Sequence, residues 1–273
     1  MDIKLIAMDL DGTALQPDHL TISGKLKKAL QQAHDRGIFI VPVTGRPYRL
    51  LPPFLLGHPA WESYAVLCNG AQIRDLRTDR VHAHFPMERE HLQKVLKIVE
   101  HYDLPAEFNS DGRLYLTQKS LSQEMQEPKL LFHCRAFLPK HGSIVENLED
   151  CCQMQVEKVH MNCIPRDRWN QIQQDLRNLD VSVVCEKPPN LEVTHRCATK
   201  GQGLAALCRE LSIPLGNVMA IGDSGNDLSM LETAGFSVAM GSSPDYIKSA
   251  ANAITGSNLE DGAAEAILKY VLQ

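Results

Sequence analysis

Apolar residues along the chain alternate between short continuous runs and helical spacings. The first run covers residues 3–9 and ends in Asp-Leu-Asp-Gly, as expected of a strand buried on both faces of a parallel sheet. A helix is predicted next, because apolar residues recur at helical spacing at Ile22, Leu26, Ala29, Leu30 and Ala33. Gly37 is placed to end this helix before the next run, residues 38–41. The order predicts a strand–helix–strand unit.

The same pattern returns later in the chain. Apolar runs at 64–68, 218–221 and 236–240 predict further strands, and short helical spacings separate the last two. This alternation predicts an α/β fold with an open, doubly wound parallel sheet. Ligands bind such a sheet at the carboxyl ends of its strands, where Asp9, Thr44, Asn69 and Asp223 fall.

The pattern of apolar and polar residues changes between residues 85 and 190. Helical spacings over 92–99 and 169–179, in which Trp169 is expected to be a core residue, are interleaved with short strand candidates. Residues 118–152 show no clean periodicity. We expect a core domain of residues 1–84 and 191–273, with residues 85–190 inserted as a second α/β domain.

Composition excludes several classes of protein. A hydrophobic content of 44% with 22% charged residues is ordinary for a soluble globular protein, and a net charge of −5 with dispersed Lys and Arg argues against a nucleic-acid partner. The chain meets acidic residues too early for a signal peptide, and no apolar run is long enough for a membrane span. A cytoplasmic protein is expected. Its eight cysteines form no Cys-x-x-Cys pair, so we expect reduced thiols, buried at Cys68 and Cys208, and no disulfides.

Asp9 and Asp11 close the first strand and precede Gly12 and Thr13. An Asp-x-Asp pair alone is weak evidence, since calcium loops, metal-dependent glycosyltransferases and simple helix caps use it too. Two carboxylates at a dry strand end repel each other, so both stay charged only if a cation or hydrogen bonds compensate them, and a divalent metal would do so. Asp223 and Asp227 add oxygen ligands at a second strand end. Oxygen ligands of this kind favour Mg²⁺.

Two further segments offer groups that can bind an anion. Thr44-Gly45-Arg46 follows a strand and offers a hydroxyl and backbone N–H groups, and Lys200-Gly201 opens a predicted helix. Each has a structural alternative, Thr44 as a capping hydroxyl and Lys200 as a surface charge. Their joint occurrence at strand ends favours phosphate binding.

These four segments resemble the four motifs of the haloacid dehalogenase superfamily in order and spacing. Within it, the chain is similar to the Cof-type sugar-phosphatase group through residues 68–71, 191–194 and 257–262. That group carries a large α/β cap between the second and third motifs. The long insertion between Thr44 and Lys200 lies at this place.

The resemblance implies a mechanism and its residues. Asp9 is the nucleophile that forms an aspartyl-phosphate, and Asp11 is the general acid and base. Mg²⁺ is held by the Asp9 carboxylate, the Asp11 backbone carbonyl and Asp223. Asp227 is implied to keep the metal or Lys200 in position without binding the metal directly. Thr44 and Lys200 complete the catalytic set. The implied phosphate- and substrate-binding residues are Leu10, Thr44, Gly45, Arg46, Asn69, Lys200 and Asn226.

Several alternatives stay open. A sugar phosphate is the leading substrate, but flavin mononucleotide, pyridoxal phosphate and nucleotides also fit. A sugar phosphomutase would start from the same intermediate, and a non-catalytic phosphometabolite sensor would keep the fold but lose a catalytic carboxylate. A glycosyltransferase leaves Lys200 and Asp223 unexplained. We expect a monomer or weak homodimer without a membrane partner.

Three positions have two interpretations each. His82 and His84 lie on one strand face and are either a transition-metal pair or, as we favour, polar strand residues. Arg46 contacts either the substrate or the inserted domain, or it forms a structural ion pair. Pro42 lacks an N–H, so the second strand is expected to end there or to contain a bulge.

Overall fold

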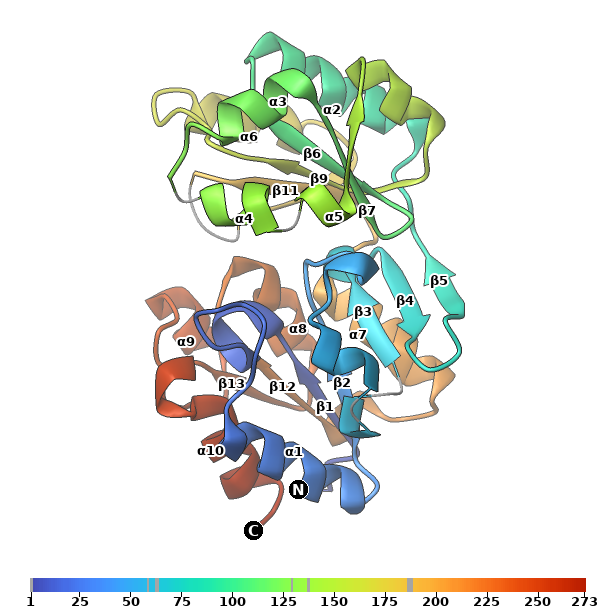
Figure 1. The fold of residues 1–273 in the computed structure, drawn as a ribbon. Coiled ribbons are helices and arrows are strands. Elements are labelled where there is room, and N and C mark those ends of the chain that lie inside the picture. The colour runs from blue at the N-terminus through green and yellow to red at the C-terminus, as the bar shows by residue number, and fades with distance from the viewer. Residues whose placement is uncertain (1, 58, 62–63, 129, 137, 186–188) are drawn as a thin grey trace. The chain divides into compact units, whose positions relative to one another are not determined.

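The computed structural model describes residues 2–57, 59–61, 64–128, 130–136, 138–185 and 189–273. The chain divides into two compact units (Figure 1). The first consists of Met1–Gly45, Leu51–His84 and Thr199–Gln273, and the second of Arg46–Leu50 and Phe85–Ala198. The segment Phe85–Ala198 of the second unit is therefore an insertion between two segments of the first unit.

A parallel five-stranded sheet forms the centre of the first unit, in the order β14-β13-β12-β1-β2. Its strands are β1 (Leu5–Met8), β2 (Phe39–Pro42), β12 (Val218–Gly222), β13 (Phe236–Ala239) and β14 (Ala253–Ile254). The helices of this unit are α1 (Gly24–Asp35), α7 (Lys200–Glu210), α8 (Leu228–Thr233), α9 (Asp245–Ala250) and α10 (Gly262–Tyr270). The predicted doubly wound α/β architecture is confirmed.

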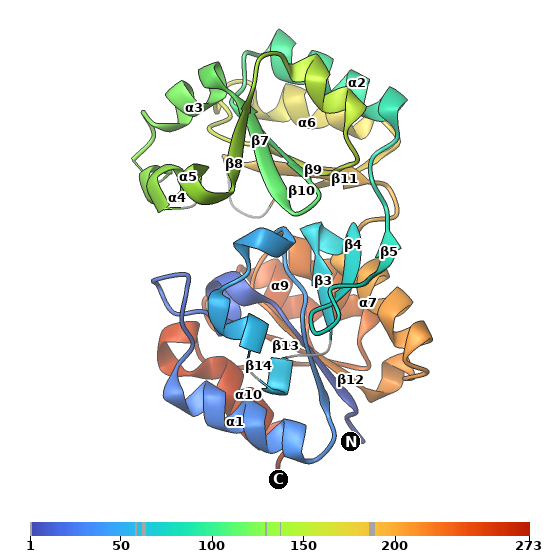
Figure 2. The same cartoon turned by 45° about the vertical axis from the view of Figure 1, so that its right-hand side comes forward.

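All four residues of β1 are fully buried, so both faces of the sheet are covered. Leu5 and Ala7 pack in one apolar cluster with Leu204 and Leu207 of α7. Since side chains alternate along a strand, Ile6 and Met8 face the opposite side, where α1 and α10 pack (Figures 1 and 2). This two-sided burial explains the continuous apolar run in the sequence.

Helix α1 contains the predicted positions Leu26 to Ala33 and ends before Gly37, but Ile22 lies outside it, ahead of the N-cap Ser23. The side chain of Ser23 accepts a hydrogen bond from the backbone N–H of Leu26 at 3.0 Å and caps the helix. Gly37, just beyond the end, has φ +77°. Its left-handed backbone turns the chain into β2.

The strand β2 includes Pro42 in regular register, opposite Met8. Phe39 and Val43 donate their N–H groups to Lys4 and Met8. Because N–H groups alternate sides along a strand, position 42 faces away from β1 and no ladder bond is lost there. The strand ends at Pro42, as one of the two expectations held, and no bulge interrupts its register.

The apolar run at 64–68 forms β3 (Tyr64–Leu67), with β4 (Gln72–Asp75) and β5 (Val81–His84) completing an antiparallel sheet of order β3-β4-β5. A single parallel bridge, Val43 to Val66, links β3 to the end of β2. The strand thus lies beside the parallel sheet, as predicted, but its main partner is antiparallel. Strand order follows from pairing partners, which the apolar run does not specify.

The second unit has a six-stranded sheet of order β10-β11-β9-β6-β7-β8, antiparallel except for β7 and β8. Its strands are β6 (Ala106–Ser110), β7 (Arg113–Thr117), β8 (Gly142–Val145), β9 (Val156–Met161), β10 (Val181–Val184) and β11 (Leu191–His195). Its helices are α2 (Arg89–His101), α3 (Gln118–Glu124), α4 (Leu131–Ala136), α5 (Leu138–His141) and α6 (Trp169–Arg177). Figure 2 shows α2 and α6 together on one face of this sheet.

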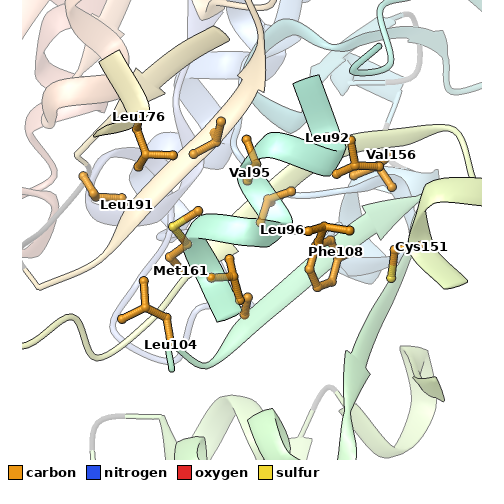
Figure 3. Packing of buried hydrophobic residues seen from close by; sticks show 14 of the residues in the cluster. Leu92, Val95, Leu96, Leu104, Phe108, Cys151, Val156, Met161, Leu176 and Leu191 are labelled. Carbon is orange, nitrogen blue, oxygen red and sulfur yellow. The ribbon is translucent and has the colours of Figure 1, made fainter. Parts of the chain in front are cut away.

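The core of the second unit lies between this face and helices α2 and α6. Leu92, Val95 and Leu96 of α2 pack against Phe108 and Met161 of the sheet (Figure 3). Trp169 packs at the edge of the same cluster, as its helical spacing predicts. The helix spacing read from the sequence therefore corresponds to a buried face.

The return to the first unit lies between Ala198 and Thr199, beyond the expected boundary at 190 and 191. Leu191–His195 pairs with β9 and β10, so this segment belongs to the second sheet. Its sequence reads as a strand in either domain, and only the pairing partner distinguishes the two. Within the described residues, no helix has the length and apolar character needed to cross a membrane.

Candidate active site

Asp9 directly follows β1 and is 4% exposed. A turn of π-helix, Leu10–Ala14, begins after it and contains Gly12 at φ +83°. A Cβ at Gly12 would lie 2.6 Å from a carboxylate oxygen of Asp223, so only glycine lets Asp223 approach this turn. The hydroxyl of Thr13 donates to Asp223 Oδ1 at 2.9 Å. The turn thereby brings the ends of β1 and β12 together.

Lys200 is the first residue of α7 and is buried. Its Nζ donates to Asp9 Oδ1 at 2.6 Å and to Asp227 Oδ1 at 2.7 Å. The start of α7 is itself fixed, because the Thr199 side chain accepts from the N–H of Gln202 at 3.2 Å. The interpretation of Lys200 as a surface charge is therefore wrong.

Asp227 is bound on both sides of its carboxylate. Oδ1 accepts from Lys200, and Oδ2 accepts from the backbone N–H groups of Asp223 at 2.9 Å and Ser224 at 3.0 Å. These bonds close the turn after β12. The geometry makes Asp227 a residue that holds both Lys200 and the backbone of Asp223.

Carboxylate oxygens of Asp9, Asp223 and Asp227 lie within 4.8 Å of one another, and this is the only such metal-binding group among the described residues. Burial raises the pKa of Asp9 well above 3.8, as do Asp227 and Asp223, while Lys200 lowers it. Burial lowers the pKa of Lys200, but Asp227 and Asp9 raise it further, so Lys200 stays charged. One ammonium cannot balance three carboxylates, and a divalent cation with oxygen ligands fits this donor set.

Thr44 lies beside Asp9, because Val43 before it donates its N–H to Met8 at 2.9 Å. The backbone N–H of Asn69 donates to the carbonyl of Thr44 at 3.1 Å, and Nδ2 of Asn226 donates to Oδ1 of Asn69 at 3.3 Å. All three polar side chains are buried. Residues from three separate segments of the sequence therefore meet at one end of the sheet.

The turn that carries Asn69 is backbone-strained. Cys68, Asn69 and Gly70 have φ of 48°, 56° and 102°. A Cβ at Gly70 would lie 2.2 Å from the carbonyl oxygen of Thr199, so the turn touches the start of α7. Such strain is concentrated at functional sites. Asn69 and Gly70 therefore lie in a turn that leaves β3 beside the start of α7.

The remaining predicted positions divide between the two units. Leu10 is buried in the π-helical turn, and Gly45 follows Thr44. Nη1 of Arg46 donates to the carbonyl of Leu50 at 3.0 Å, and both residues belong to the second unit. His82 pairs with Glu210, and neither His82 nor His84 belongs to a metal-binding group of three among the described residues. Cys68 and Cys208 are buried, as expected.

His19 is a residue near the site that no sequence motif indicates. Its Nδ1 lies 2.7 Å from Oδ1 of Asp11, whose side chain is 24% exposed. A histidine eight residues after Asp11 in a polar stretch carries no motif. Only the folding of residues 16–21 back toward the π-helical turn brings the two side chains together.

A second missed feature is a buried polar face of the second sheet. The strand register aligns two rows across β6, β9 and β11, Glu107–His160–Glu192 and Asn109–Lys158–Thr194. Lys158 pairs with Glu192, whereas neither amide atom of Asn109 has a hydrogen-bond partner among the described residues. Alternation of apolar and polar residues in each strand was the available signal, as in Leu191-Glu192-Val193-Thr194.

An open parallel α/β sheet with buried carboxylates and a lysine at its strand ends defines a phosphoryl-transfer type of site. The model of the haloacid dehalogenase-like hydrolase family matches residues 6–267, and the chain belongs to this family. The superfamily resemblance of the four motifs is confirmed.

Relatives that match over the full length include two phosphatases with a named substrate. The chain is 31% identical to the 5-amino-6-(5-phospho-D-ribitylamino)uracil phosphatase of Bacillus subtilis, covering 100% of this chain and 97% of that protein. It is 28% identical to the pyridoxal phosphate phosphatase of Escherichia coli, covering 100% of both chains. With such relatives, the protein is a phosphatase of small phosphorylated molecules.

Solved structures agree on the fold. A haloacid dehalogenase-like hydrolase from B. subtilis superimposes with a TM-score of 0.86 at 27% identity, covering 98% of this chain and 100% of that chain. A sugar phosphatase of haloacid dehalogenase subclass IIB gives a TM-score of 0.80 at 22% identity, covering 99% and 100%. The Cof-type arrangement of core and inserted α/β domain is thereby confirmed.

Proposed function

We propose that this protein is a magnesium-dependent phosphatase that hydrolyses phosphate monoesters of small metabolites through an aspartyl-phosphate on Asp9. The observation that carries the proposal is the buried cluster in which Lys200 Nζ lies 2.6 Å from Asp9 and 2.7 Å from Asp227. A buried carboxylate held by an ammonium is oriented for attack and shielded from water.

The chain's own residues supply the steps. Asp9 attacks phosphorus, so an Asp9 O–P bond forms while the bond to the leaving oxygen breaks and Asp11 gives that oxygen a proton. Water then attacks phosphorus, Asp11 takes its proton, and the Asp9 O–P bond breaks. Mg²⁺ bound by the Asp9 carboxylate, the Asp11 backbone carbonyl and Asp223 would offset repulsion between nucleophile and phosphate.

The phosphoryl oxygens would be held by neighbouring groups of the same sheet end. Lys200, the hydroxyl of Thr44 and the amide of Asn226 supply charge and donors, with backbone N–H groups of Leu10 and Gly45. Asn69 orients Asn226 through their 3.3 Å hydrogen bond. Asp227 keeps Lys200 in place.

The substrate is proposed to be a sugar phosphate or a related phosphorylated metabolite. The relatives named above act on a ribitylamino-uracil phosphate and on pyridoxal phosphate, so both compounds belong in any substrate panel beside sugar phosphates and flavin mononucleotide. We further propose that the inserted residues select the substrate. The buried polar face that contains Asn109 supports this, because an unpartnered buried amide is costly unless a ligand uses it.

Phosphate release from this panel tests the proposal, measured with Mg²⁺ and then with a chelator. Asp9→Asn is expected to lower kcat by at least about a thousandfold while the circular dichroism spectrum stays unchanged. Activity that persists in Asp9→Asn would exclude the covalent route. A well-folded wild type that releases no phosphate from any compound would instead favour a mutase, detectable by phosphoryl return to a sugar, or a sensor.

A further inference from the structure

The two aspartates of the first motif have different partners. The Asp9 carboxylate is buried and bound by Lys200. The Asp11 carboxylate is not part of the group formed by Asp9, Asp223 and Asp227, and its Oδ1 lies 2.7 Å from Nδ1 of His19. With Asp11 ionised, an N–H at Nδ1 donates to the carboxylate. A separate histidine therefore holds the proposed acid and base.

The loop that carries His19 is fixed by its own hydrogen bonds. Gln16 donates its N–H to the carbonyl of Thr21, and His19 donates its N–H to the carbonyl of Gln16. Asp18 accepts from the N–H groups of Leu20 and Thr21, each at 2.9 Å. His19 adopts φ +57°, a left-handed conformation that histidine tolerates better than bulkier residues.

The C-terminal segment supports this loop. Nδ2 of Asn258 donates to the carbonyl of Leu15 at 2.9 Å, and Nε2 of Gln16 reaches the carbonyl of Asn258 at 3.4 Å. Asn258 lies in the segment 257–262, and no residue of this segment takes part in the proposed chemical steps. This segment thus connects the end of the chain to the loop that positions His19.

We propose that His19 is a positioning residue for Asp11, and this inference rests on the proposed phosphatase function. The imidazole holds the Asp11 carboxyl in the orientation that delivers a proton to the leaving oxygen. The hydrogen bond restricts the rotamer of a partly exposed carboxyl, and proton transfer depends on a fixed geometry.

The consequence depends on the leaving group. An alcohol leaves a phosphate ester only when its oxygen is protonated, whereas p-nitrophenolate is a stable anion that leaves without a proton. Loss of His19 should therefore slow hydrolysis of an alkyl phosphate far more than hydrolysis of p-nitrophenyl phosphate. A general loss of folding would slow both equally.

His19→Gly tests this, because glycine accepts the left-handed backbone while removing the imidazole. We expect kcat/KM for the best alkyl phosphate to fall by about tenfold or more, and kcat/KM for p-nitrophenyl phosphate by less than about threefold. This ratio reports the step in which the leaving group departs, whereas the later attack of water, with Asp11 as base, is common to both substrates. His19→Asn, which keeps a side-chain N–H and tolerates the same backbone, should recover part of the loss. Leu20→Ala in the same loop is the control and should leave both rates unchanged.

Equal losses on the two substrates, or no loss on either, would overturn the role of His19. Failure of the proposed function has a different signature, since the wild type would then hydrolyse neither substrate, or Asp9→Asn would retain activity. That result would overturn both proposals. Thermal unfolding of each variant confirms that the compared proteins are folded.

Discussion

Buried charged side chains in this protein form ion pairs with individual residues of opposite charge. Lys200 balances Asp9 and Asp227 in the first unit, and His133 pairs with Glu107 in the second at 2.6 Å. A buried ion pair contributes little net stability, but removal of one partner is costly because it leaves an unpaired charge. Buried charge in the first unit is concentrated in groups that have a proposed chemical role.

Glu124 and Glu107 form a buried pair with opposite protonation. Burial and the charge of Glu107 raise the pKa of Glu124 above 4.5, and Oε1 of Glu124 accepts from Nδ2 of Asn162 at 2.8 Å. Burial alone would raise the pKa of Glu107, but His133 lowers it below 4.5. Glu124 is therefore neutral at neutral pH.

This pair predicts a pH dependence of stability. Because the folded-state pKa of Glu124 is raised, its contribution is complete below pH 4.5 and is lost as pH rises toward the folded value. Glu124→Gln mimics the protonated form. Urea unfolding should show that the wild type loses up to about 1.4 kcal/mol more per pH unit than Glu124→Gln between about pH 6 and about pH 8. The exposed control Glu146→Gln should follow the wild type, and parallel pH profiles for wild type and Glu124→Gln would contradict the assignment.

At the scale of elements, close contact between a turn and a helix determines where Lys200 lies. The turn after β3 has three consecutive residues with positive φ, and Gly70 in it touches the backbone of Thr199 at the start of α7. A shift of α7 away from this turn would also move Lys200 away from Asp9. The contact therefore links two motifs that are distant in the sequence.

Gly70→Ala tests this contact. The added Cβ would lie 2.2 Å from the Thr199 carbonyl oxygen at a backbone φ of 102°. We expect a loss of about 3 kcal/mol in the free energy of unfolding, together with a lower kcat. In Gly24→Ala, the control at the start of α1, a Cβ meets no atom within 4 Å. If Gly70→Ala were as stable as Gly24→Ala, the turn would be more adaptable than the contact indicates.

At the scale of the whole molecule, the two units contain different kinds of buried polar groups. The first contains three carboxylates near one ammonium at the strand ends, and the second contains Asn109, whose two amide atoms have no partner among the described residues. We propose that the first unit performs the chemistry and that Asn109 of the inserted unit takes part in selecting substrates. A structural core without a binding role would be more stable with an apolar residue at position 109.

Asn109→Leu should therefore change stability and substrate use in opposite directions. The free energy of unfolding is expected to stay constant or rise by about 1 kcal/mol, while KM for the best metabolite rises about three- to tenfold, the value of one hydrogen bond. Unfolding in urea and steady-state kinetics measure the two effects. Asn178→Leu, at the exposed end of α6, should change neither quantity. An unchanged KM for Asn109→Leu would remove this residue from substrate selection.

The sequence was sufficient for the strand–helix–strand unit at the start of the chain and for the positions of the motifs, but not for the helices and strand within residues 118–152. The apolar run ending at Asp9, the spacing of α1 and the stop at Gly37 predicted the βαβ unit, because burial on both sides of a parallel sheet requires such runs. The four motifs at strand ends were predictable for the same reason. Parallel strands place their carboxyl ends at one edge, so Asp9, Thr44 and Asp223 could be expected to meet.

The tertiary structure decided what depends on partners distant in the chain. It assigned Leu191–His195 to the second sheet, placed Pro42 with its missing N–H away from β1, and brought His19 to Asp11. It also aligned Glu107 and Asn109 with β9 and β11 into a buried polar face. Hydrophobic spacing records which face of an element is buried, but the choice of neighbour is set by packing and pairing across the fold, which no local stretch of sequence encodes.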